Sequence, residues 1–451
     1  MRVLLLGSGG RESALAWALA RSSTVTQLYA APGNPGIARQ ADLIALDPAD
    51  AASAVDAARS VGADLVVVGP EAPLVAGVAD ALRADGRKVF GPERAAARIE
   101  GSKSYAKELM DRAGVPTARW ETFDAVEPAT KLLDELGPPY VVKADGLAAG
   151  KGVVVTDDRA AAIDALEERL VRGAFGDAGT RVVVEEYLDG PEASLIAFVD
   201  GNTALACEVA QDYKRIYDDD EGPNTGGMGS YSPVPACPSD LADRIVADVI
   251  DPMVVATRTD GAPFVGALYA GLALTSRGPR VVEFNVRFGD PETQALLPRL
   301  RSDLAEVALA AASGELAGAE LEWTPQACVS VVLAPRGYPG PHETGHEIAG
   351  LDALEQRGDV FVFQAGTARR NRSLVTSGGR VLAVSALGNG FGEARRRAYD
   401  AADSISFEGK HMRRYIARRA EGVGSERSSR RARSPSGMAE KSRGQPEARG
   451  E

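Results

Sequence analysis

Short apolar runs alternate with Ala- and Leu-rich stretches through the first hundred residues. The runs Val3–Leu6, Gln27–Ala31 and Leu65–Val68 have the length and composition of buried strands, and stretches such as Val75–Ala84 have helical periodicity. Strands that alternate with helices at this spacing predict a parallel sheet with helices on both faces. Ligand sites in such sheets lie beyond the carboxyl ends of the strands, where this sequence places the turns GSGGRES, PGNPG and GPEAP.

Strand-type residues dominate the second block of the chain, which begins near Gly101. Its clearest runs are Tyr140–Ala144, Ala193–Val199 and Ala267–Thr275, and helical stretches interrupt them. A third block after Trp323 holds further strand signals and ends in a helical stretch. We therefore expect a multidomain α/β and α+β protein, in which a parallel-sheet domain comes first and a small α+β domain comes last.

The composition is that of an ordinary globular protein. The chain has 451 residues, 45% of them hydrophobic and 25% charged, which is enough material for about three domains. No apolar run approaches the roughly 20 residues that span a bilayer, so no membrane partner is expected. The three cysteines are widely spaced, as in reduced proteins of the cytoplasm, and exclude a disulfide framework. Histidine-based metal or triad chemistry is not expected from the three histidines, which are His342, His346 and His411.

The net charge of −12 is unevenly distributed. Nine Lys/Arg and five Asp/Glu lie between Arg418 and Glu451, a local balance of +4 that leaves −16 for residues 1–417. An acidic body argues against nucleic acid as a substrate. Residues 420–451 show no periodic apolar face, and we expect a disordered basic tail there. Alternatively, its segment RSSRRARS could bind RNA or anionic lipid.

A glycine-rich loop joins two apolar runs in the segment KADGLAAGKGVVV. Lys143 ends the first run, and Gly150 and Gly152 flank Lys151. A P-loop would need four residues between its glycines and a Ser or Thr after the lysine, and neither is present. A loop of this kind between two strands can close over a triphosphate and supply amide donors and positive charge. The segment therefore predicts phosphate binding, with a solvated hairpin as the alternative.

Polar side chains line one face of the strand predicted in VVEFNVRFGDPET. Glu283 and Asn285 are two residues apart and therefore face the same side. A carboxylate and an amide oxygen, completed by phosphate oxygens and water, suit octahedral Mg²⁺. Arg287 follows on that face, where it can neutralise a phosphoryl group or a carboxylate, and Asp290 follows at a glycine turn.

Other segments offer polar groups at less specific spacing. GSGGRES opens a helix whose N-terminus can receive an anion, although a purely structural turn is an equal alternative. The strand end in VVVEEYLDGPEAS can present backbone groups to an adenine and the Glu192 carboxylate to ribose hydroxyls. QDYKR contributes Asp212 and Lys214. GPNTGGMG contributes amides and the Thr225 hydroxyl, unless it is a disordered crossing loop.

Together these segments resemble the phosphoribosylamine–glycine ligase family of the ATP-grasp superfamily. The resemblance covers about residues 1–419 and depends most on KADGLAAGKGV, PNTGGMG and FGDPE. It implies a pre-ATP-grasp domain over 1–102 that binds 5-phosphoribosylamine, an ATP-grasp domain over 103–318 with a lid lobe at about 119–190, and a C-terminal domain over 322–419. The implied reaction is the ATP-dependent ligation of glycine to 5-phosphoribosylamine through glycyl phosphate, which yields glycinamide ribonucleotide, ADP and phosphate in de novo purine biosynthesis.

The resemblance also implies roles for the positions that match the family's motifs. The implied catalytic residues are Arg287, Asp290, Asp212 and Lys214. The implied ligands of Mg²⁺, or alternatively of Mn²⁺, are Glu283 and Asn285. The implied ATP-binding residues are Lys103, Lys143, Gly150, Lys151, Gly152, Glu185, Glu186, Leu188 and Glu192. The implied substrate-binding residues are Gly9, Gly10, Arg11, Glu12, Asn34, Pro70, Glu71, Asn224, Thr225, Gly226 and Gly227.

Three positions depart from the family's usual motifs: Ser13 and Tyr213 replace histidines, and Val286 replaces a common cysteine. Without a histidine, no base for the amine is evident from the sequence. We expect a monomer whose partners are ATP, glycine and 5-phosphoribosylamine. The alternatives are another ATP-grasp carboxylate–amine ligase, a non-catalytic nucleotide sensor, and an NAD dehydrogenase, which Glu12 disfavours because it replaces the third glycine of the dinucleotide fingerprint.

Overall fold

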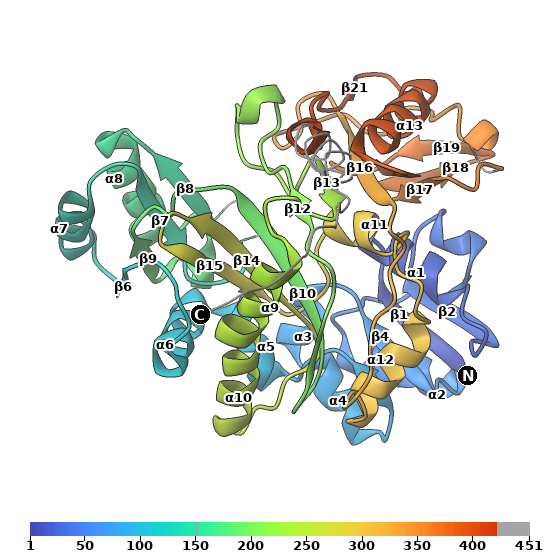
Figure 1. Cartoon of the computed structure of the whole chain (residues 1–451), viewed down its shortest axis with the longest axis horizontal. Helices are drawn as coiled ribbons and strands as arrows, with labels where there is room; N and C mark the ends of the chain where they lie inside the picture. Colours follow the sequence, from blue (N-terminus) through green and yellow to red (C-terminus); the bar gives the residue numbers. More distant parts are fainter. Residues whose placement is uncertain (149–151, 355, 422–451) are drawn as a thin grey trace, which may run out of the picture.

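The computed structural model describes residues 1–148, 152–354 and 356–421 of the chain. The predicted ATP contacts Gly150 and Lys151, and residues 422–451 of the predicted tail, lie outside this part of the chain. Figure 1 shows an N-terminal sheet in blue, a projecting sheet in teal, a central sheet in green and yellow, and a C-terminal sheet in orange and red. Ala420 is buried and Glu421 pairs with Arg395, so the packed chain extends two residues past the predicted boundary at 419.

The first hundred residues form the parallel sheet that the sequence predicts. Its strands have the order β3-β2-β1-β4-β5 and comprise β1 (Arg2–Gly7), β2 (Gln27–Pro32), β3 (Asp42–Leu43), β4 (Leu65–Val68) and β5 (Lys88–Phe90). Its helices are α1 (Gly10–Leu19), α2 (Ala51–Val61), α3 (Glu71–Ala76) and α4 (Val78–Ala84). The prediction of one helix over Val75–Ala84 is wrong, because Gly77 adopts a φ of +87° and separates α3 from α4.

This strand order determines where the sheet can bind a ligand. β1 lies between β2 and β4, and the chain crosses from one half of the sheet to the other at this point. Ligands of open α/β sheets bind in the crevice beyond the carboxyl ends of the strands at such a point. Gly9 and Glu71, two of the predicted substrate-binding residues, lie shortly after the ends of β1 and β4.

A second, antiparallel sheet projects from the molecule with its own helices (Figure 1). Its strands, in the order β6-β9-β7-β8, are β6 (Trp120–Phe123), β9 (Val182–Glu185), β7 (Tyr140–Ala144) and β8 (Val153–Thr156). Two helices, α7 (Val126–Leu136) and α8 (Arg159–Leu170), pack on it around a separate hydrophobic cluster that includes Leu133, Val142 and Leu166. Because this sheet has a core of its own, it can hold its shape while its position relative to the body changes. We refer to it as the lid sheet.

The central sheet is antiparallel and is made of β11 (Ala204–Ala206), β10 (Glu192–Asp200), β14 (Val265–Thr275) and β15 (Gly278–Asn285). The helices α5 (Arg94–Gly101) and α6 (Lys103–Ala113) connect the N-terminal sheet to this region. The helical segment over residues 239–259 and α12 (Leu304–Ser313) also pack here. Phe90, Phe198 and Phe288 form a mutual aromatic cluster, with ring centroids 5.4–6.0 Å apart, that fixes the N-terminal sheet against the central sheet.

The C-terminal sheet combines strands from two distant parts of the sequence. Its order is β12-β13-β16-β20-β17, with β21 (Lys410–His411) paired to β16. The other strands are β12 (Gln211–Asp212), β13 (Gly229–Ser232), β16 (Ala327–Pro335), β17 (Val360–Gln364) and β20 (Leu382–Gly388). The helix α13 (Phe391–Ser404) covers it, and a short hairpin, β18 (Thr367–Arg370) and β19 (Ser373–Thr376), extends beside it. Because β12 and β13 belong to the middle of the chain, the C-terminal sheet is tied to the loop between them.

One hydrophobic cluster connects these regions. It runs from Leu4 in the N-terminal sheet through Leu268 in the central sheet to Val384 in the C-terminal sheet, all fully buried. The cysteines at positions 207, 237 and 328 are buried and unpaired, as the sequence predicts. Within the described ranges, no helix has the length and apolar character needed to cross a membrane.

Candidate active site

Arg287 lies where the end of β15 meets the N-terminal sheet. Its Nε donates to Glu71 Oε2 at 3.1 Å, and its Nη2 donates to Glu100 Oε1 at 2.9 Å and to Asn285 Oδ1 at 3.1 Å. Burial opposes the charged form of Glu71, but the charges of Arg287 and Arg11 outweigh it and hold the pKa of Glu71 below its ordinary value. The arginine is thereby fixed by two carboxylates from a different part of the chain, which pre-organises it for contact with an anion.

Glu100 is a site residue that sequence reasoning missed. It is buried near the end of α5, accepts the Val286 amide at 2.7 Å and pairs with Arg287. Burial raises its pKa, although the charge of Arg287 acts in the opposite direction. The only available signal was an acid on the apolar side of an amphipathic helix directly before the GSK motif.

The predicted metal ligands lie side by side at the end of β15. Burial opposes the ionised form of Glu283, but the charges of Lys214, Lys143 and Lys103 outweigh it and hold its pKa below the ordinary value. Among the residues that the structure describes, no group of three or more His, Cys, Asp and Glu side chains could hold a metal by itself. One ionised carboxylate and one amide oxygen fit Mg²⁺ bound jointly with nucleotide phosphates, which supply the missing oxygens.

Two predicted phosphate-binding lysines lie near this pair. Lys143, on β7, forms an ion pair with Glu185 and donates to the Val282 carbonyl at 3.1 Å. Lys103 opens α6, and its Nζ donates to the Gly146 carbonyl at 3.3 Å. Burial lowers the pKa of Lys103, although the charge of Glu283 acts in the opposite direction. The structure therefore brings together two cations from different elements, as a polyphosphate site requires.

The start of the glycine-rich loop is also well defined. The Asp145 carboxylate accepts the Ser104 amide at 2.7 Å and pairs with Arg181 at 2.7 Å, which ties the loop to the beginning of α6. A Cβ on Gly152 would lie 2.6 Å from that of Ala148, so the loop returns too tightly for a larger residue there.

The predicted adenine-binding segment presents few free side chains. Glu185 points inward, with only 4% of its side chain exposed, and contacts two lysines. Glu186 accepts hydrogen bonds from the Arg119 amide and the Arg277 guanidinium, each at 3.1 Å. Leu188 is half-buried, and Glu192 at the start of β10 accepts Lys214 Nζ at 2.5 Å. The predicted contacts with the adenine ring therefore fall to backbone groups at the end of β9.

Asp212 and Lys214 form the acidic and basic pair of the QDYKR segment. Burial and the carboxylates of Glu292, Glu192 and Glu283 raise the pKa of Asp212 to about 8, against the opposing charge of Lys214. Burial opposes the charged form of Lys214, but the carboxylates of Glu192, Asp212 and Glu283 outweigh it and raise its pKa. Asp212 is therefore a carboxyl group that exchanges its proton near neutral pH, which suits a general acid–base.

Glu292 is another residue that sequence reasoning left without a role, although it lies within the quoted motif FGDPE. It is 3% exposed and accepts the Tyr269 hydroxyl at 2.9 Å and the Ser194 hydroxyl at 3.2 Å. A Cβ on Gly289 would lie 2.5 Å from its carboxylate, so the preceding glycine gives this buried acid its space.

The predicted phosphoribosyl loop forms the start of α1. The Gly9 amide donates to Glu12 Oε2 at 2.6 Å, and the Arg11 amide donates to Asp290 Oδ2 at 3.2 Å. Burial opposes the ionised form of Asp290, but Arg380 and Arg11 outweigh it and lower its pKa. Two carboxylates of the chain therefore already face this helix terminus. Glu12, which replaces the third glycine of the dinucleotide fingerprint, accepts the Gly9 amide within the chain.

Gly10, Asn34 and Pro70 occupy defined places around this loop. A Cβ on Gly10 would lie 2.7 Å from Gln294 Nε2. The Asn34 amide nitrogen donates to the carbonyls of Ser8 and Gln364, at 2.8 Å and 2.9 Å, and its oxygen accepts two backbone amides. Pro70 precedes the first residue of α3. Since the Asn34 side chain is already bonded at both ends, it acts here as a link between the N-terminal and C-terminal regions.

The PNTGG loop is held from the C-terminal region. The Gly226 amide donates to the Tyr338 hydroxyl at 3.1 Å, and the Gly226 carbonyl accepts Arg380 Nη1 at 2.6 Å. Within the loop, Thr225 Oγ1 donates to the Lys214 carbonyl at 2.8 Å and accepts the Gly227 amide at 2.9 Å. Asn224 pairs with Arg215 across the base of this loop, and a side chain on Gly227 (φ +108°) would collide with Pro291.

Arg380 is the third residue that sequence reasoning missed as a site residue. Besides Gly226, its Nη1 contacts the Asp290 carbonyl at 2.7 Å and the Asp290 carboxylate at 3.2 Å. It lies two residues before β20 starts, in the quoted motif GGRVL, which was the available signal. Asp290 is therefore the point where the N-terminal region, through Arg11, the central region and the C-terminal region meet.

Family models match almost all of the described chain in three consecutive parts. The "Phosphoribosylglycinamide synthetase, N domain" matches residues 1–100, the "ATP-grasp (A) domain" of the same family matches 101–293, and its "C domain" matches 328–419. The chain belongs to the phosphoribosylglycinamide synthetase family. The sequence-based recognition and the expected three-part ATP-grasp fold are thereby confirmed.

Curated relatives of this synthetase carry the name phosphoribosylamine–glycine ligase. The protein of Agrobacterium fabrum is 50% identical over 416 residues, which are 92% of this chain and 98% of its own. That of Caulobacter vibrioides is 52% identical over 93% of this chain and 98% of its own. That of Streptomyces coelicolor is 52% identical over 94% of this chain and 100% of its own.

Solved structures agree with this assignment. The crystal structure of phosphoribosylamine–glycine ligase from Thermotoga maritima matches with a TM-score of 0.80 and 35% identity, over 92% of this chain and 99% of that one. The biotin carboxylase domain of the Hydrogenobacter thermophilus 2-oxoglutarate carboxylase, in complex with MgADP and bicarbonate, matches with a TM-score of 0.71 over 91% of each chain. At 18% identity, the second match supports the fold alone.

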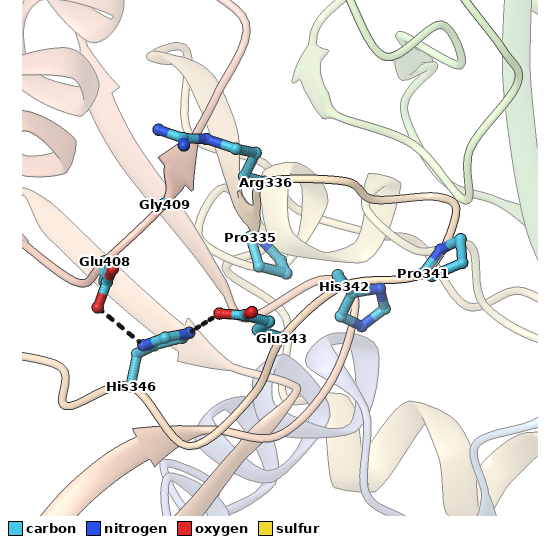
Figure 2. Close-up of a pocket in the computed structure, with 8 residues that line it drawn as sticks. All are labelled: Pro335, Arg336, Pro341, His342, Glu343, His346, Glu408 and Gly409. Atoms are coloured by element: carbon cyan, nitrogen blue, oxygen red, sulfur yellow. Dashed lines mark ion pairs between the residues drawn. The ribbon is translucent and has the colours of Figure 1, made fainter.

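The synthetase has a further cavity of about 500 Å³ in its C-terminal region. Figure 2 shows His346 between Glu343 and Glu408, whose carboxylates lie 3.5 Å and 3.3 Å from its two ring nitrogens. Both carboxylates are more than four-fifths exposed (88% and 82%), so these pairs contribute little to stability. None of the predicted site residues that the structure describes lines this cavity, and we place it outside the candidate active site.

Proposed function

We propose that this chain ligates glycine to 5-phosphoribosylamine with ATP, and releases glycinamide ribonucleotide, ADP and phosphate, as a step of de novo purine biosynthesis. Relatives about half identical to it over nearly the whole chain carry the name of this ligase. The observation that carries the proposal is the meeting of three regions at Asp290, beside Arg287 and the Glu283–Asn285 pair. A ligase of three substrates needs its nucleotide and acceptor sites to converge in this way.

In this proposal the nucleotide lies between the lid sheet and β15. Lys103 and Lys143 counter the charge of its phosphates, and Glu283 and Asn285 would hold Mg²⁺, for which a carboxylate and an amide oxygen are suitable ligands. When bound, Mg²⁺ neutralises phosphate charge and orients the γ-phosphoryl group. We also propose that Mn²⁺ can replace Mg²⁺ at these two ligands. A relative in fold, the Hydrogenobacter biotin carboxylase domain, has been crystallised with MgADP.

The first chemical step is transfer of the γ-phosphoryl group to glycine. A carboxylate oxygen of glycine attacks the γ-phosphorus, the bond from that phosphorus to the bridging oxygen breaks, and ADP leaves with that electron pair. The product is glycyl phosphate. Arg287, held in place by Glu71 and Glu100, stabilises the charge on the glycine carboxylate and on the transferred group.

The second step joins the amine to the activated glycine. The phosphoribosylamine nitrogen attacks the carbonyl carbon of glycyl phosphate, the carbon–oxygen bond to phosphate breaks, and the nitrogen gives up one proton. Asp212 accepts this proton in our proposal, because its raised pKa lies near the working pH. Residues at the start of α1 and in the PNTGG loop hold the phosphoribosyl group, on opposite sides of Asp290.

The proposal includes a monomer in the cytoplasm whose partners are these three small molecules. The buried, unpaired cysteines support a reducing compartment. The acidic composition of the body supports the exclusion of nucleic acid.

A substrate-omission assay tests the proposed reaction. Purified protein is incubated with ATP, Mg²⁺, glycine and freshly generated 5-phosphoribosylamine, and ADP and glycinamide ribonucleotide are quantified. We expect equal amounts of both products, and neither product without phosphoribosylamine. Product formation with another amine, combined with no activity on phosphoribosylamine, would indicate a different carboxylate–amine ligase. Nucleotide binding without any turnover would indicate the sensor alternative.

A further inference from the structure

A buried carboxylate with two lysines lies at the junction of the lid sheet and the central sheet. Glu185 Oε1 pairs with Lys143, and Glu185 Oε2 pairs with Lys107 at 2.6 Å. The three side chains are 4%, 4% and 3% exposed. Lys143 is a predicted phosphate-binding residue, but Lys107 has no role in the proposed reaction. We refer to Glu185, Lys143 and Lys107 as the buried triad.

Lys107 is enclosed too deeply to contact a ligand. It lies one helical turn after Lys103 on α6, and its Nζ donates to the Thr117 hydroxyl at 2.7 Å in addition to its contact with Glu185. Both partners of the Lys107 ammonium group, Glu185 and Thr117, are residues of the protein and not of a ligand. Any influence of Lys107 on the reaction therefore passes through Glu185 or Thr117.

The contacts of Lys143 leave it one donor for a phosphate. Its ammonium group has three N–H donors, and Glu185 and the Val282 carbonyl take two of them. A carboxylate that served Lys143 alone would neutralise it and draw it away from a ligand. Because Lys107 holds the other oxygen, Glu185 is shared, and the triad has more positive than negative groups. Burial lowers the pKa of Lys107, although the charge of Glu185 acts in the opposite direction, and the ionised Glu283 carboxylate lies near Lys143. The ATP phosphates would add further negative charge beside these lysines.

The same residues connect the lid sheet to the strand that carries the predicted metal ligands. Thr117 Oγ1 accepts from Lys107 and donates to the Val281 carbonyl at 2.7 Å, while Lys143 donates to the next carbonyl, that of Val282. The triad thus links α6, the lid strands β7 and β9, and β15. The same contacts consequently connect the phosphate-binding lysine to the strand that carries the Glu283–Asn285 pair.

We infer that Lys107 is a positioning residue for nucleotide binding, which holds the second oxygen of Glu185 and thereby aims the charge of Lys143 at the phosphates of ATP. This inference rests on the proposed ATP site. It predicts an effect on the nucleotide end of the reaction and none on the affinity for phosphoribosylamine.

The main test is the variant Lys107→Met, which keeps the length of the side chain and removes its charge. Its affinity for a non-hydrolysable ATP analogue with Mg²⁺ is measured by titration calorimetry. We expect the Kd to rise about tenfold, as for the loss of other supporting contacts behind a ligand-binding residue. The KM for phosphoribosylamine should stay within about twofold. Lys107→Arg, which keeps the charge and the donors, should recover most of the affinity.

A matched control removes the same charge from the surface of the lid sheet. Lys131 on α7 is 72% exposed and pairs only weakly with Glu127, one helical turn away. Lys131→Met should leave the Kd of the analogue unchanged.

A double-mutant cycle tests whether Lys107 acts through Glu185. Once Glu185→Gln has removed the shared carboxylate, adding Lys107→Met should change the Kd by less than about twofold. A full tenfold effect in that background would overturn the inference. An unchanged Kd for Lys107→Met itself, with only a lowered melting temperature, would also overturn it, since Lys107 would then be merely structural.

Thr117→Val keeps every charge and provides a second route if Lys107→Met does not fold. It removes the hydroxyl that accepts from Lys107 and donates to the Val281 carbonyl, so the Kd should rise about threefold, and no change would contradict the inference. Failure of the proposed function is recognised separately. A protein that binds the analogue with these shifts but makes no glycinamide ribonucleotide would refute the ligase and leave the role of Lys107 intact.

Discussion

The side chain of Glu283 shows how its neighbours determine the charge of a single carboxylate. Three lysines from α6, β7 and the QDYKR segment hold its pKa down despite burial. With its neighbour Asn285, this ionised group is the proposed anchor for Mg²⁺. Both residues were assigned from their spacing alone, because a strand places residues two apart on one face.

Glu283→Gln tests this anchor, since it keeps the shape and removes the charge. We expect kcat to fall by about 10²–10³-fold, as on loss of a comparable electrostatic contact. The melting temperature without nucleotide should fall, because a pKa held below its ordinary value means that the ionised Glu283 carboxylate stabilises the fold through its neighbouring lysines. Steady-state ADP release and thermal melting measure the two effects, and Glu127→Gln on the exposed face of α7 is the control. Turnover within twofold of the wild type would refute the metal assignment.

Asp212 has the opposite character, because its neighbours keep it protonated at higher pH. As the pH rises through about 8, Asp212 loses its proton and becomes able to accept one from the amine. The kcat/KM for phosphoribosylamine should therefore rise toward pH 8, and Asp212→Asn should remove this rise and lower the rate about 10²-fold. A variant that retained the wild-type pH profile would exclude Asp212 as the proton acceptor.

The raised pKa of Asp212 also makes the stability of the protein depend on pH. A folded-state pKa of about 8 against an ordinary value of 3.8 means that the folded protein binds this proton more tightly than the unfolded chain. The stability contributed by Asp212 is therefore complete below about pH 4 and is lost as the pH rises toward 8. Melting curves across this range should show Asp212→Asn gaining on the wild type with increasing pH.

Sequence reasoning located the residues that lie in distinctive motifs and missed those defined by contacts between distant segments. Glu283, Asn285 and Arg287 were proposed because three polar residues alternate on an apolar strand. Glu100 and Arg380 act through partners 187 and 90 or more residues away in sequence, and their local signals do not reveal these partners. The local signal also did not indicate that Glu185 points inward, because a strand end is compatible with either direction.

At the scale of elements, the first turn of α1 is the most informative case. Gly9 lies directly before this helix, with a Glu12 cap on one side and Asp290 beyond it. A Cβ there would lie 2.7 Å from Glu12 Oε2, so a larger residue must displace the cap. Replacement of Gly9 therefore disturbs this loop and leaves the nucleotide site in place.

Gly9→Val should raise the KM for phosphoribosylamine by at least about tenfold through this displacement. The Kd for a non-hydrolysable ATP analogue should stay within about twofold, because the lysines that face the nucleotide lie on α6 and β7. Titration calorimetry and initial rates separate the two. Loss of nucleotide affinity in a folded protein, with phosphoribosylamine affinity unchanged, would require the two sites to be exchanged.

The elements that sequence reasoning overlooked had weak or ambiguous local signals. The prolines of α7 and of the turn after it are typical of loops, but Pro128 lies in the first turn of the helix, where no backbone partner is lost. The strand β6 is only half-buried and lacks a clear apolar alternation. β12 is two polar residues long and is defined only by its pairing with β13.

At the scale of the whole molecule, the C-terminal region completes the site. Arg380 contacts both the PNTGG loop and Asp290, so residues from the last quarter of the chain shape a site built mainly by the first three quarters. Sequence reasoning expected a domain that packs against the others. It did not predict that β12 and β13, from the middle of the chain, would join the C-terminal sheet and position the site residues that lie between them.

Arg380→Gln should weaken phosphoribosylamine binding by about 10–100-fold, because a charged donor shared by two backbone carbonyls is lost. Arg380→Lys should recover only part of the phosphoribosylamine binding, since a single ammonium group cannot reproduce the planar contacts of the guanidinium group. Initial rates at varied phosphoribosylamine, with ATP saturating, give the KM. An unchanged KM in both variants would place the C-terminal region outside the site.

The central claim is that glycine is activated as glycyl phosphate, and oxygen transfer tests it most directly. Glycine labelled with ¹⁸O in its carboxylate is turned over with ATP, Mg²⁺ and phosphoribosylamine, and the released phosphate is analysed by mass spectrometry. Because the carboxylate oxygen that attacks phosphorus leaves with the phosphate, each phosphate should carry one ¹⁸O, and ADP should carry none. Unlabelled phosphate, or label in AMP, would contradict the account.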